Sequence, residues 1–63
     1  MSKYPEDEPA RARAINEAMA EFAEENHLKL AYEEYARMGR LMDLDDMSPL
    51  EAFKEMEREA RDE

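Results

Sequence analysis

The chain has almost none of the residues that favour β-strands. Valine and threonine are absent from its 63 residues, and Ile15 is the only isoleucine. Alanine, glutamate, leucine, methionine and arginine dominate instead, and these residues favour helices. We therefore predict an all-α fold, either a small helical hairpin or a three-helix arrangement.

The length of the chain limits how stable such a fold can be. With 63 residues it forms one domain at most. A single core of this size rarely supplies more than roughly 3–5 kcal/mol of stability. Because there is no cysteine, neither a disulfide nor a thiolate-bound metal can contribute. We expect self-association or a partner protein to supply part of the missing stability.

The chain is strongly acidic, with a formal net charge of −9 from 18 acidic and 9 basic residues. Proteins that bind nucleic acids use Lys and Arg to neutralise phosphates, and anionic membrane surfaces attract basic segments. We therefore expect no direct nucleic-acid partner and no membrane partner. A protein partner attracted by charge should carry a basic surface. No apolar run is long enough to span a membrane, and residues 1–9 lack a signal peptide's apolar stretch, so the expected location is the cytoplasm.

The order of residues predicts a flexible acidic arm at 1–8 and a single small helical domain at 9–63. Helices are expected at about 9–26, 28–42 and 49–61. The last has the clearest start, because Ser48-Pro49-Leu50-Glu51 is a capping box with proline at the first helical position. Gly39, the only glycine, is a candidate cap for the second helix.

The apolar face of the predicted helices changes side near Asn26. Before this residue, Ile15, Met19 and Phe22 share one helical face, and the apolar stripe that follows His27 would continue on the opposite face of an unbroken helix. One explanation is a turn at Asn26-His27, two residue types that enter the left-handed conformation more readily than most. The alternative is one long helix that offers different faces to different neighbours.

A catalytic site is not expected, and neither is a cofactor. Ser2 lies in the arm, Ser48 is explained as a helix cap, and His27 is far from both in sequence. Carboxylates are so abundant that no pair of them is informative. The few large apolar residues leave little material for the sheltered pocket in which a carboxyl pKa is shifted for catalysis.

Two stretches have spacings that occur in metal sites. Glu24 and His27 form Glu-x-x-His, a spacing found in helical di-iron carboxylate proteins. Both residues lie off the apolar face, so a solvated or turn-forming histidine is the more ordinary interpretation. The acidic stretch at Asp43 begins like a calcium-binding EF-hand, but Ser48 and Lys54 replace its glycine and its bidentate glutamate. We assign no metal ligands.

The apolar candidates for partner binding form two groups. Ile15, Met19 and Phe22 are the better candidates for an exposed face if the chain forms one long helix. Tyr32 and Tyr35 share a helical side with methionines, and both residue types are enriched in interface cores. The alternative, which we favour, is that this tyrosine stripe packs against the last helix.

The acidic candidates for partner binding are Glu17, Glu21 and Glu24, which form a row on the first helix with Glu25 beside it. Such a row can imitate the phosphates of a nucleic acid, although charged rows on helices are usually only solvated. Arg37 and Arg40 form a small basic island for which an intrachain ion pair is the expected role.

These observations favour a non-catalytic protein-binding module. The leading hypothesis is an inhibitor or modulator of a larger enzyme or nucleoprotein complex. Phage anti-defence inhibitors such as anti-CRISPR proteins have a similar size and charge, which is an analogy and not a motif match. The alternatives are an antitoxin, or an accessory subunit that docks through Leu50, Phe53 and Met56. A homo-oligomeric metal site at Glu24 and His27 ranks third, and a helix-turn-helix DNA reader ranks last because the middle helix is not basic.

Overall fold

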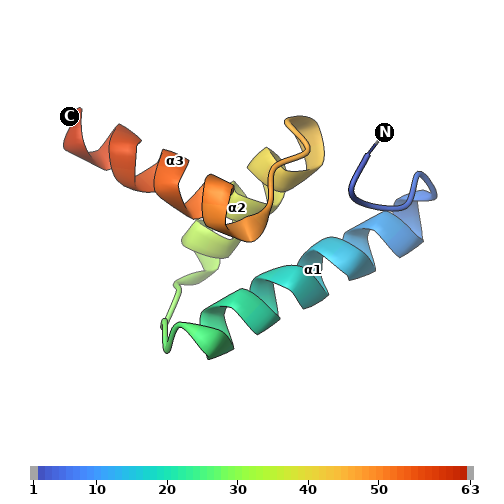
Figure 1. Cartoon of the computed structure of the whole chain (residues 1–63), viewed down its shortest axis with the longest axis horizontal. Coiled ribbons are helices and arrows are strands. Elements are labelled where there is room, and N and C mark those ends of the chain that lie inside the picture. The colour runs from blue at the N-terminus through green and yellow to red at the C-terminus, as the bar shows by residue number, and fades with distance from the viewer. Residues whose placement is uncertain (1, 63) are drawn as a thin grey trace.

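The computed structural model describes residues 2–62 and contains three helices, α1 (Glu8–Glu25), α2 (Tyr32–Leu44) and α3 (Pro49–Arg61). No strand occurs within these residues. Each helix packs against both of the others, which confirms the all-α prediction in its three-helix form. α2 lies behind the other two helices, and α1 and α3 diverge toward their C-terminal ends (Figure 1). Residue 1 of the predicted arm (1–8) and residue 63 of the predicted domain (9–63) lie outside the described residues.

α1 ends at a turn, as the change of apolar face suggested. The Leu28 N–H donates to the Ala23 carbonyl over 2.8 Å, and the His27 N–H donates to the Glu24 carbonyl over 3.3 Å. His27 has a φ of 53°, so this is a Schellman cap with a left-handed residue directly after the helix cap. The turn at Asn26-His27 is confirmed, and the alternative of one long helix is wrong.

α2 starts four residues later than predicted. The segment before it is extended, and the Ala31 N–H at the helix start donates to the Glu34 carboxylate over 2.9 Å. The expectation that Gly39 caps this helix is also wrong, because Gly39 lies inside α2. A Cβ on Gly39 would lie 3.5 Å from Cε of Met19, so the glycine sits where α2 packs against α1.

α3 begins and ends where the sequence indicates. The Glu51 N–H donates to Ser48 Oγ over 3.3 Å, and the Ser48 N–H donates to the Glu51 carboxylate over 3.1 Å. These two bonds satisfy backbone donors that the first helical turn leaves without partners. The capping box therefore fixes the residue at which α3 starts.

All three helices contribute to a small core that is rich in methionine. Met38 and Met42 of α2 are completely buried, and the other members of the core cluster are Ile15, Met19 and Ala52. The rings of Phe22 and Phe53 pack at its edge with centroids 5.6 Å apart. Since methionine side chains are flexible, they fill the irregular space between helices that cross at an angle.

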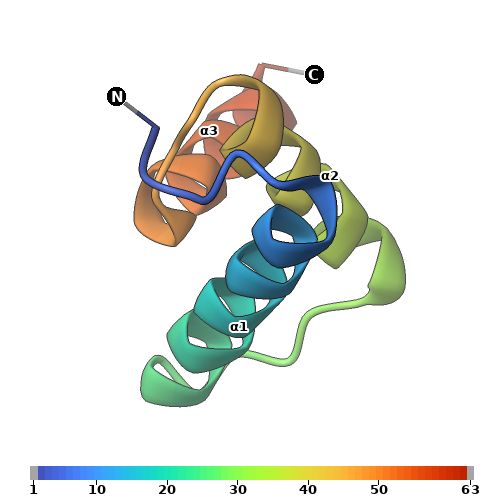
Figure 2. The same cartoon turned by 90° about the vertical axis from the view of Figure 1, so that its right-hand side faces the viewer.

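The segment expected to be a flexible arm is docked in the structure. It folds back beside the connection between α2 and α3 (Figure 2). The Tyr4 hydroxyl donates to the Met47 carbonyl over 2.7 Å, and the Ser2 hydroxyl donates to the Asp46 carboxylate over 2.8 Å. The Lys3 N–H donates to the same carboxylate over 3.0 Å. Residues 2–4 are held because the loop supplies hydrogen-bond acceptors that face their donors.

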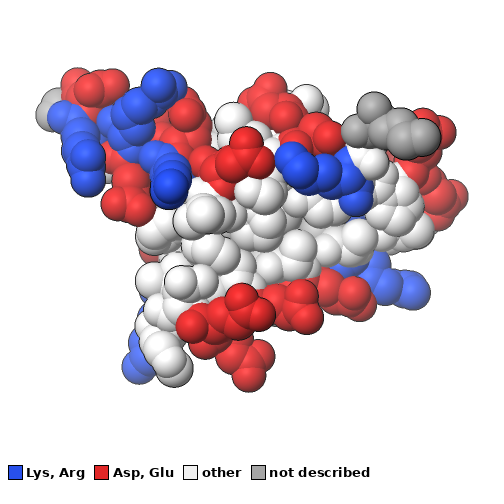
Figure 3. Space-filling model, in the orientation of Figure 1, with Lys and Arg blue, Asp and Glu red and all other residues white. Residues whose placement is uncertain are grey.

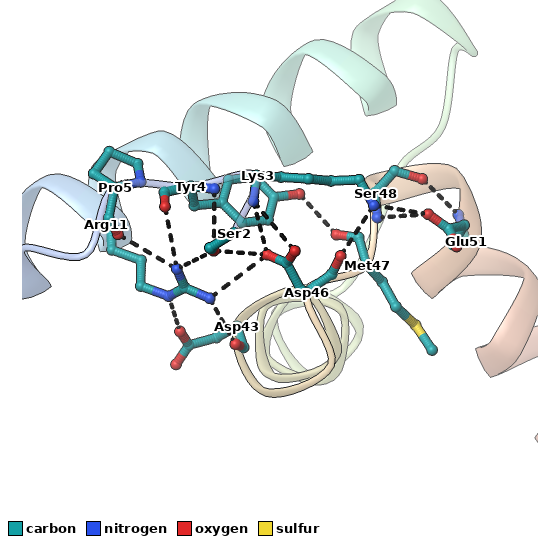
Figure 4. Close-up of polar contacts among 10 residues, drawn as sticks. All are labelled: Ser2, Lys3, Tyr4, Pro5, Arg11, Asp43, Asp46, Met47, Ser48 and Glu51. Atoms are coloured by element: carbon teal, nitrogen blue, oxygen red, sulfur yellow. Dashed lines mark hydrogen bonds and ion pairs between the residues drawn. The ribbon is translucent and has the colours of Figure 1, made fainter.

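Arg11 of α1 links the arm to the end of α2 (Figure 4). Its guanidinium binds the Asp43 carboxylate, donates to the Asp43 carbonyl over 2.8 Å and donates to Ser2 Oγ over 2.7 Å. It also stacks against the Tyr4 ring, 5.7 Å from the centroid. The first turn of α1 is thereby tied to the last turn of α2 and, through the Asp46 carboxylate at 3.9 Å from the guanidinium, to the loop from which α3 starts.

Candidate functional site

Most of the first apolar group is part of the core. Ile15 and Met19 are each only 5% exposed, so they stabilise the fold and cannot form a free face. The condition for their proposed binding role was one long helix, and the turn after α1 removes it. Phe22 is half-buried, and the exposed part of its side chain lines a groove.

The two tyrosine candidates are separated by the fold. Tyr32, at the first position of α2, is 86% exposed, whereas Tyr35 is half-buried against the core. Farther along the same stripe, Met38 and Met42 are completely buried. The tyrosines therefore do not form one continuous binding surface.

A shallow groove of about 310 Å³ lies between the C-terminal half of α1 and the start of α3. Phe22 and Leu50 are its large apolar side chains, and the rest of the lining is Ala18, Glu21, Glu25, Ser48 and Pro49. Leu50 is 49% exposed. Figure 3 shows an uncharged band between α1 and α3, bordered by Asp and Glu side chains along the α1 edge. We call this surface the α1–α3 face.

Local structure holds the apolar side chains of this groove in place. The ring contact with Phe53 of α3 orients Phe22 of α1. The capping box at Ser48 fixes the first turn of α3, and with it Pro49 and Leu50. The groove is therefore formed in advance by rigid helices, which reduces the entropy that a partner loses on binding.

Carboxylates form one edge of the groove. Glu21 and Glu25 line it directly, whereas Glu17 and Glu24 are exposed on α1 without lining it. None of these four carboxylates forms an ion pair with another of the described residues. The groove therefore combines exposed apolar area with negative charge that residues 2–62 do not neutralise.

A larger groove of about 630 Å³ lies on the other side of α1, against α2. Arg11 and Asp43 line it and pair with each other across it, and Gly39 lies at its α2 side. Two of its three charged groups thus already have partners within the fold, and Glu8 is the third. Because Ile15 of the core also lines it, we assign this groove to the packing of α1 on α2.

The residues considered for catalysis and metal binding have structural roles. His27 is the left-handed residue of the α1 cap, and Ser48 caps α3. Within residues 2–62, no three His, Asp or Glu side chains form a group that could hold a metal ion. Arg37 forms the expected intrachain ion pair, with Glu59 at 2.8 Å.

The shifted pKa values belong to the docked arm and the adjacent cap, not to the groove. The hydrogen bond from the Ser2 hydroxyl, followed by that from the Lys3 backbone, lowers the pKa of Asp46 below its ordinary value. The backbone hydrogen bond from Ser48 lowers the pKa of Glu51, and burial raises the pKa of Tyr4. The hydrogen bonds that lower the two carboxyl pKa values stabilise the fold, and none of the three shifted groups lines the groove of the α1–α3 face, although Ser48 of the adjacent cap does.

Phe22 and Glu21 of the groove were predicted as binding residues and Glu25 was placed beside the acidic row, whereas Ala18 was not considered as a lining residue. Leu50 was considered only as part of a docking stripe on the last helix. The capping box was the sequence signal that could have placed Leu50. It makes Leu50 the second residue of α3 and so fixes the side of the helix on which it lies. The crossing of α1 and α3, which brings Leu50 beside Phe22, has no local signature.

Comparison with known proteins adds no assignment, since no protein-family model, characterised protein or solved structure matches this chain. Within residues 2–62, none of the three helices is long and apolar enough to cross a membrane.

Proposed function

We propose that this chain is a non-catalytic protein-binding module whose docking site is the α1–α3 face. The observation that carries the proposal is the groove in which Phe22 and Leu50 lie beside Glu21 and Glu25. Apolar anchors at the centre and charge at the rim are the usual arrangement of a protein interface.

The apolar part of the groove favours an amphipathic helix as the bound element. Leu50 is half-exposed although large apolar residues are scarce in this chain. An apolar side chain inserted between Phe22 and Leu50 would remove both from water, at a gain of about 25 cal/mol per Å² of apolar surface. Helices that dock in this way present anchors at every third or fourth position.

The charged part of the site selects a partner with a basic surface. Lys or Arg next to the apolar anchors would face Glu21 and Glu25, which have no ion-pair partner within the described residues. The net charge of −9 also attracts a basic partner at long range and accelerates association. The interaction should therefore weaken as salt is added.

Within this class, an inhibitor or modulator of a larger enzyme or nucleoprotein complex is the role that we favour, as in anti-CRISPR proteins. Basic surfaces are common where such machines bind nucleic acid. Binding by imitation of phosphates would use the whole α1 row, including Glu17 and Glu24, whereas groove binding uses Glu21 and Glu25.

The accessory-subunit hypothesis shares the same face but draws mainly on its apolar part. Leu50 is accessible for such docking, whereas Phe53 and Met56 pack against the core. A subunit docked through Leu50 alone would keep its partner at high salt. If the chain is an antitoxin, its captured partner should be a small basic toxin.

A tagged pull-down from the host or the natural target cell, read by mass spectrometry at low and high salt, tests the proposal. We expect wild type to retain one dominant partner at low salt and to release it at high salt. Leu50→Ser should lose this partner. Tyr32→Ser is the matched control, because Tyr32 is exposed but lies outside the groove, and it should retain the partner. Equal retention by both variants would contradict docking on the α1–α3 face.

A further inference from the structure

The exposed side of α3 carries the chemistry expected of the partner. Lys54, Arg58 and Arg61 follow Leu50 at helical spacings of four, eight and eleven residues, which place all four on one side of the helix. All four are exposed. Glu57 lies on the same side and subtracts one charge, and Arg58 also forms an ion pair with Glu55 of the same helix. The first turn of α3 thus supplies an apolar anchor, and the following turns supply a basic stripe.

The basic stripe and the acidic edge border the same face of the molecule. Figure 3 shows Lys and Arg side chains interspersed with Asp and Glu side chains over the C-terminal half of α3, and Asp and Glu side chains along α1, with the uncharged band between them. One face therefore carries opposite charges on its two edges and apolar side chains along its middle. Such a face is complementary to itself.

We infer that a second copy of this chain docks on the α1–α3 face and forms a two-fold symmetric dimer. A two-fold axis along the groove places Glu21 and Glu25 of one copy opposite Lys54 and Arg58 of the other, and the reverse pairing follows by symmetry. The Leu50 side chains then meet near the axis. The inference rests on the proposed function, because it uses the same face. In the dimer this face is covered, so the basic partner must displace one copy before it can bind.

The size and charge of the chain determine the strength expected of this dimer. The whole chain extends over 35 × 23 × 18 Å, and a standard interface buries about 800 Å² on each partner. The dimer therefore needs most of the face. Two copies with a net charge of −9 also repel each other at long range, so we expect a weak, reversible dimer.

Complementary charge reversals test the inference by sedimentation velocity over a wide concentration range. We expect wild type to form a dimer. Glu21→Lys/Glu25→Lys gives a face with two basic edges, and Lys54→Glu/Arg58→Glu gives a face with two acidic edges. Each variant alone should raise the dimer dissociation constant about tenfold or more, since both symmetry-related contacts become repulsive. An equimolar mixture of the two variants should form a heterodimer.

The mixture controls for a loss of folding, because unfolded variants would not form a heterodimer. Circular dichroism of each variant checks the folding directly. Leu50→Ser should raise the dissociation constant without changing any charge, and Glu17→Lys/Glu24→Lys, whose residues do not line the groove, should leave the dimer intact. The inference is overturned if wild type stays monomeric at every concentration, or if the mixed variants do not associate. If the dimer is absent, the pull-down can still capture a partner. If the pull-down captures no partner, the dimer can still be measured. The failure of the inference and the failure of the proposed function are therefore distinguishable.

Discussion

The hydroxyl of Tyr4 donates a 2.7 Å hydrogen bond to the carbonyl oxygen of Met47, which joins the N-terminal segment to the connection between α2 and α3. Arg11 of α1 contacts the same N-terminal segment through Ser2 and the last turn of α2 through Asp43. Because Met47 directly precedes Ser48, the cap of α3, the arm helps to set the angle between the helices that form the α1–α3 face.

Removal of this hydroxyl should destabilise the protein. Tyr4→Phe leaves the Met47 carbonyl without its donor, at a cost of about 1 kcal/mol. For a domain of this size that lowers the Tm by about 4–8 °C, measured by thermal unfolding followed by circular dichroism. Tyr32→Phe, which removes a hydroxyl from a side chain that is 86% exposed, should leave the Tm unchanged. An unchanged Tm in Tyr4→Phe would show that the arm does not contribute to stability.

The stabilising effect of Asp46 should disappear in acid. Hydrogen bonds from the Ser2 hydroxyl and the Lys3 backbone lower its pKa below the ordinary 3.8. A carboxylate whose pKa is lowered by folding stabilises the protein above its unfolded pKa, and the effect is lost as the pH falls through the folded pKa.

Asp46→Asn isolates this effect, because asparagine also tolerates the left-handed backbone that Asp46 adopts at φ 51°. Wild type should be more stable than the variant at neutral pH in chemical denaturation. The difference between them should shrink below about pH 4 as the carboxylate is protonated. A difference that stays constant down to pH 2 would contradict the role assigned to this charge.

A gain in stability is expected from Gly39→Ala. Gly39 lies inside α2 with a negative φ, and the new Cβ would meet Cε of Met19 at 3.5 Å, an ordinary van der Waals distance. Alanine is favoured over glycine in a helix interior by about 1 kcal/mol. The Tm should rise by several degrees, whereas Gly39→Leu should lower it by forcing Met19 and Ile15 apart. A lower Tm in Gly39→Ala would show that α1 and α2 pack more closely here than the structure indicates.

The C-terminal cap of α1 offers a second stabilising change. His27 has a φ of 53°, a conformation that costs a residue with a side chain roughly 1–2 kcal/mol relative to glycine. Glycine has greater conformational freedom in the unfolded chain, which offsets part of this difference. The free energy of unfolding of His27→Gly, measured in denaturant, should therefore rise by up to about 1 kcal/mol. His27→Ala should be close to neutral. A loss of stability in both variants would contradict this account and would show that the imidazole makes a stabilising contact.

Local signals in the sequence were sufficient to predict the helices. The capping box at Ser48 defined the start of α3, because its hydrogen bonds are made within four residues. The change of apolar face near Asn26 indicated the turn after α1, because a helix that buries two opposite faces needs neighbours on both sides. Helical periodicity could not show that α2 starts only at Tyr32, since Leu28 and Ala31 continue the apolar spacing.

Features that depend on contacts between distant residues were missed. Tyr4 was assigned to a flexible arm, but its hydrogen-bond partner is 43 residues away. Gly39 was considered as a cap because the packing of α2 on α1 is not visible locally. The same limit applies to the candidate site, where Ile15 is buried and Leu50 exposed only because of the way the three helices cross.

The most direct test of the α1–α3 face is the affinity of the captured partner for two matched charge variants, measured by isothermal titration calorimetry at low salt. Glu21→Lys/Glu25→Lys and Glu17→Lys/Glu24→Lys change the net charge equally on the same helix, but only the first pair lines the groove. We expect the first variant to weaken binding about tenfold or more and the second to weaken it only slightly. Equal losses from both would contradict docking in the groove and would favour imitation of a nucleic acid by the whole acidic row.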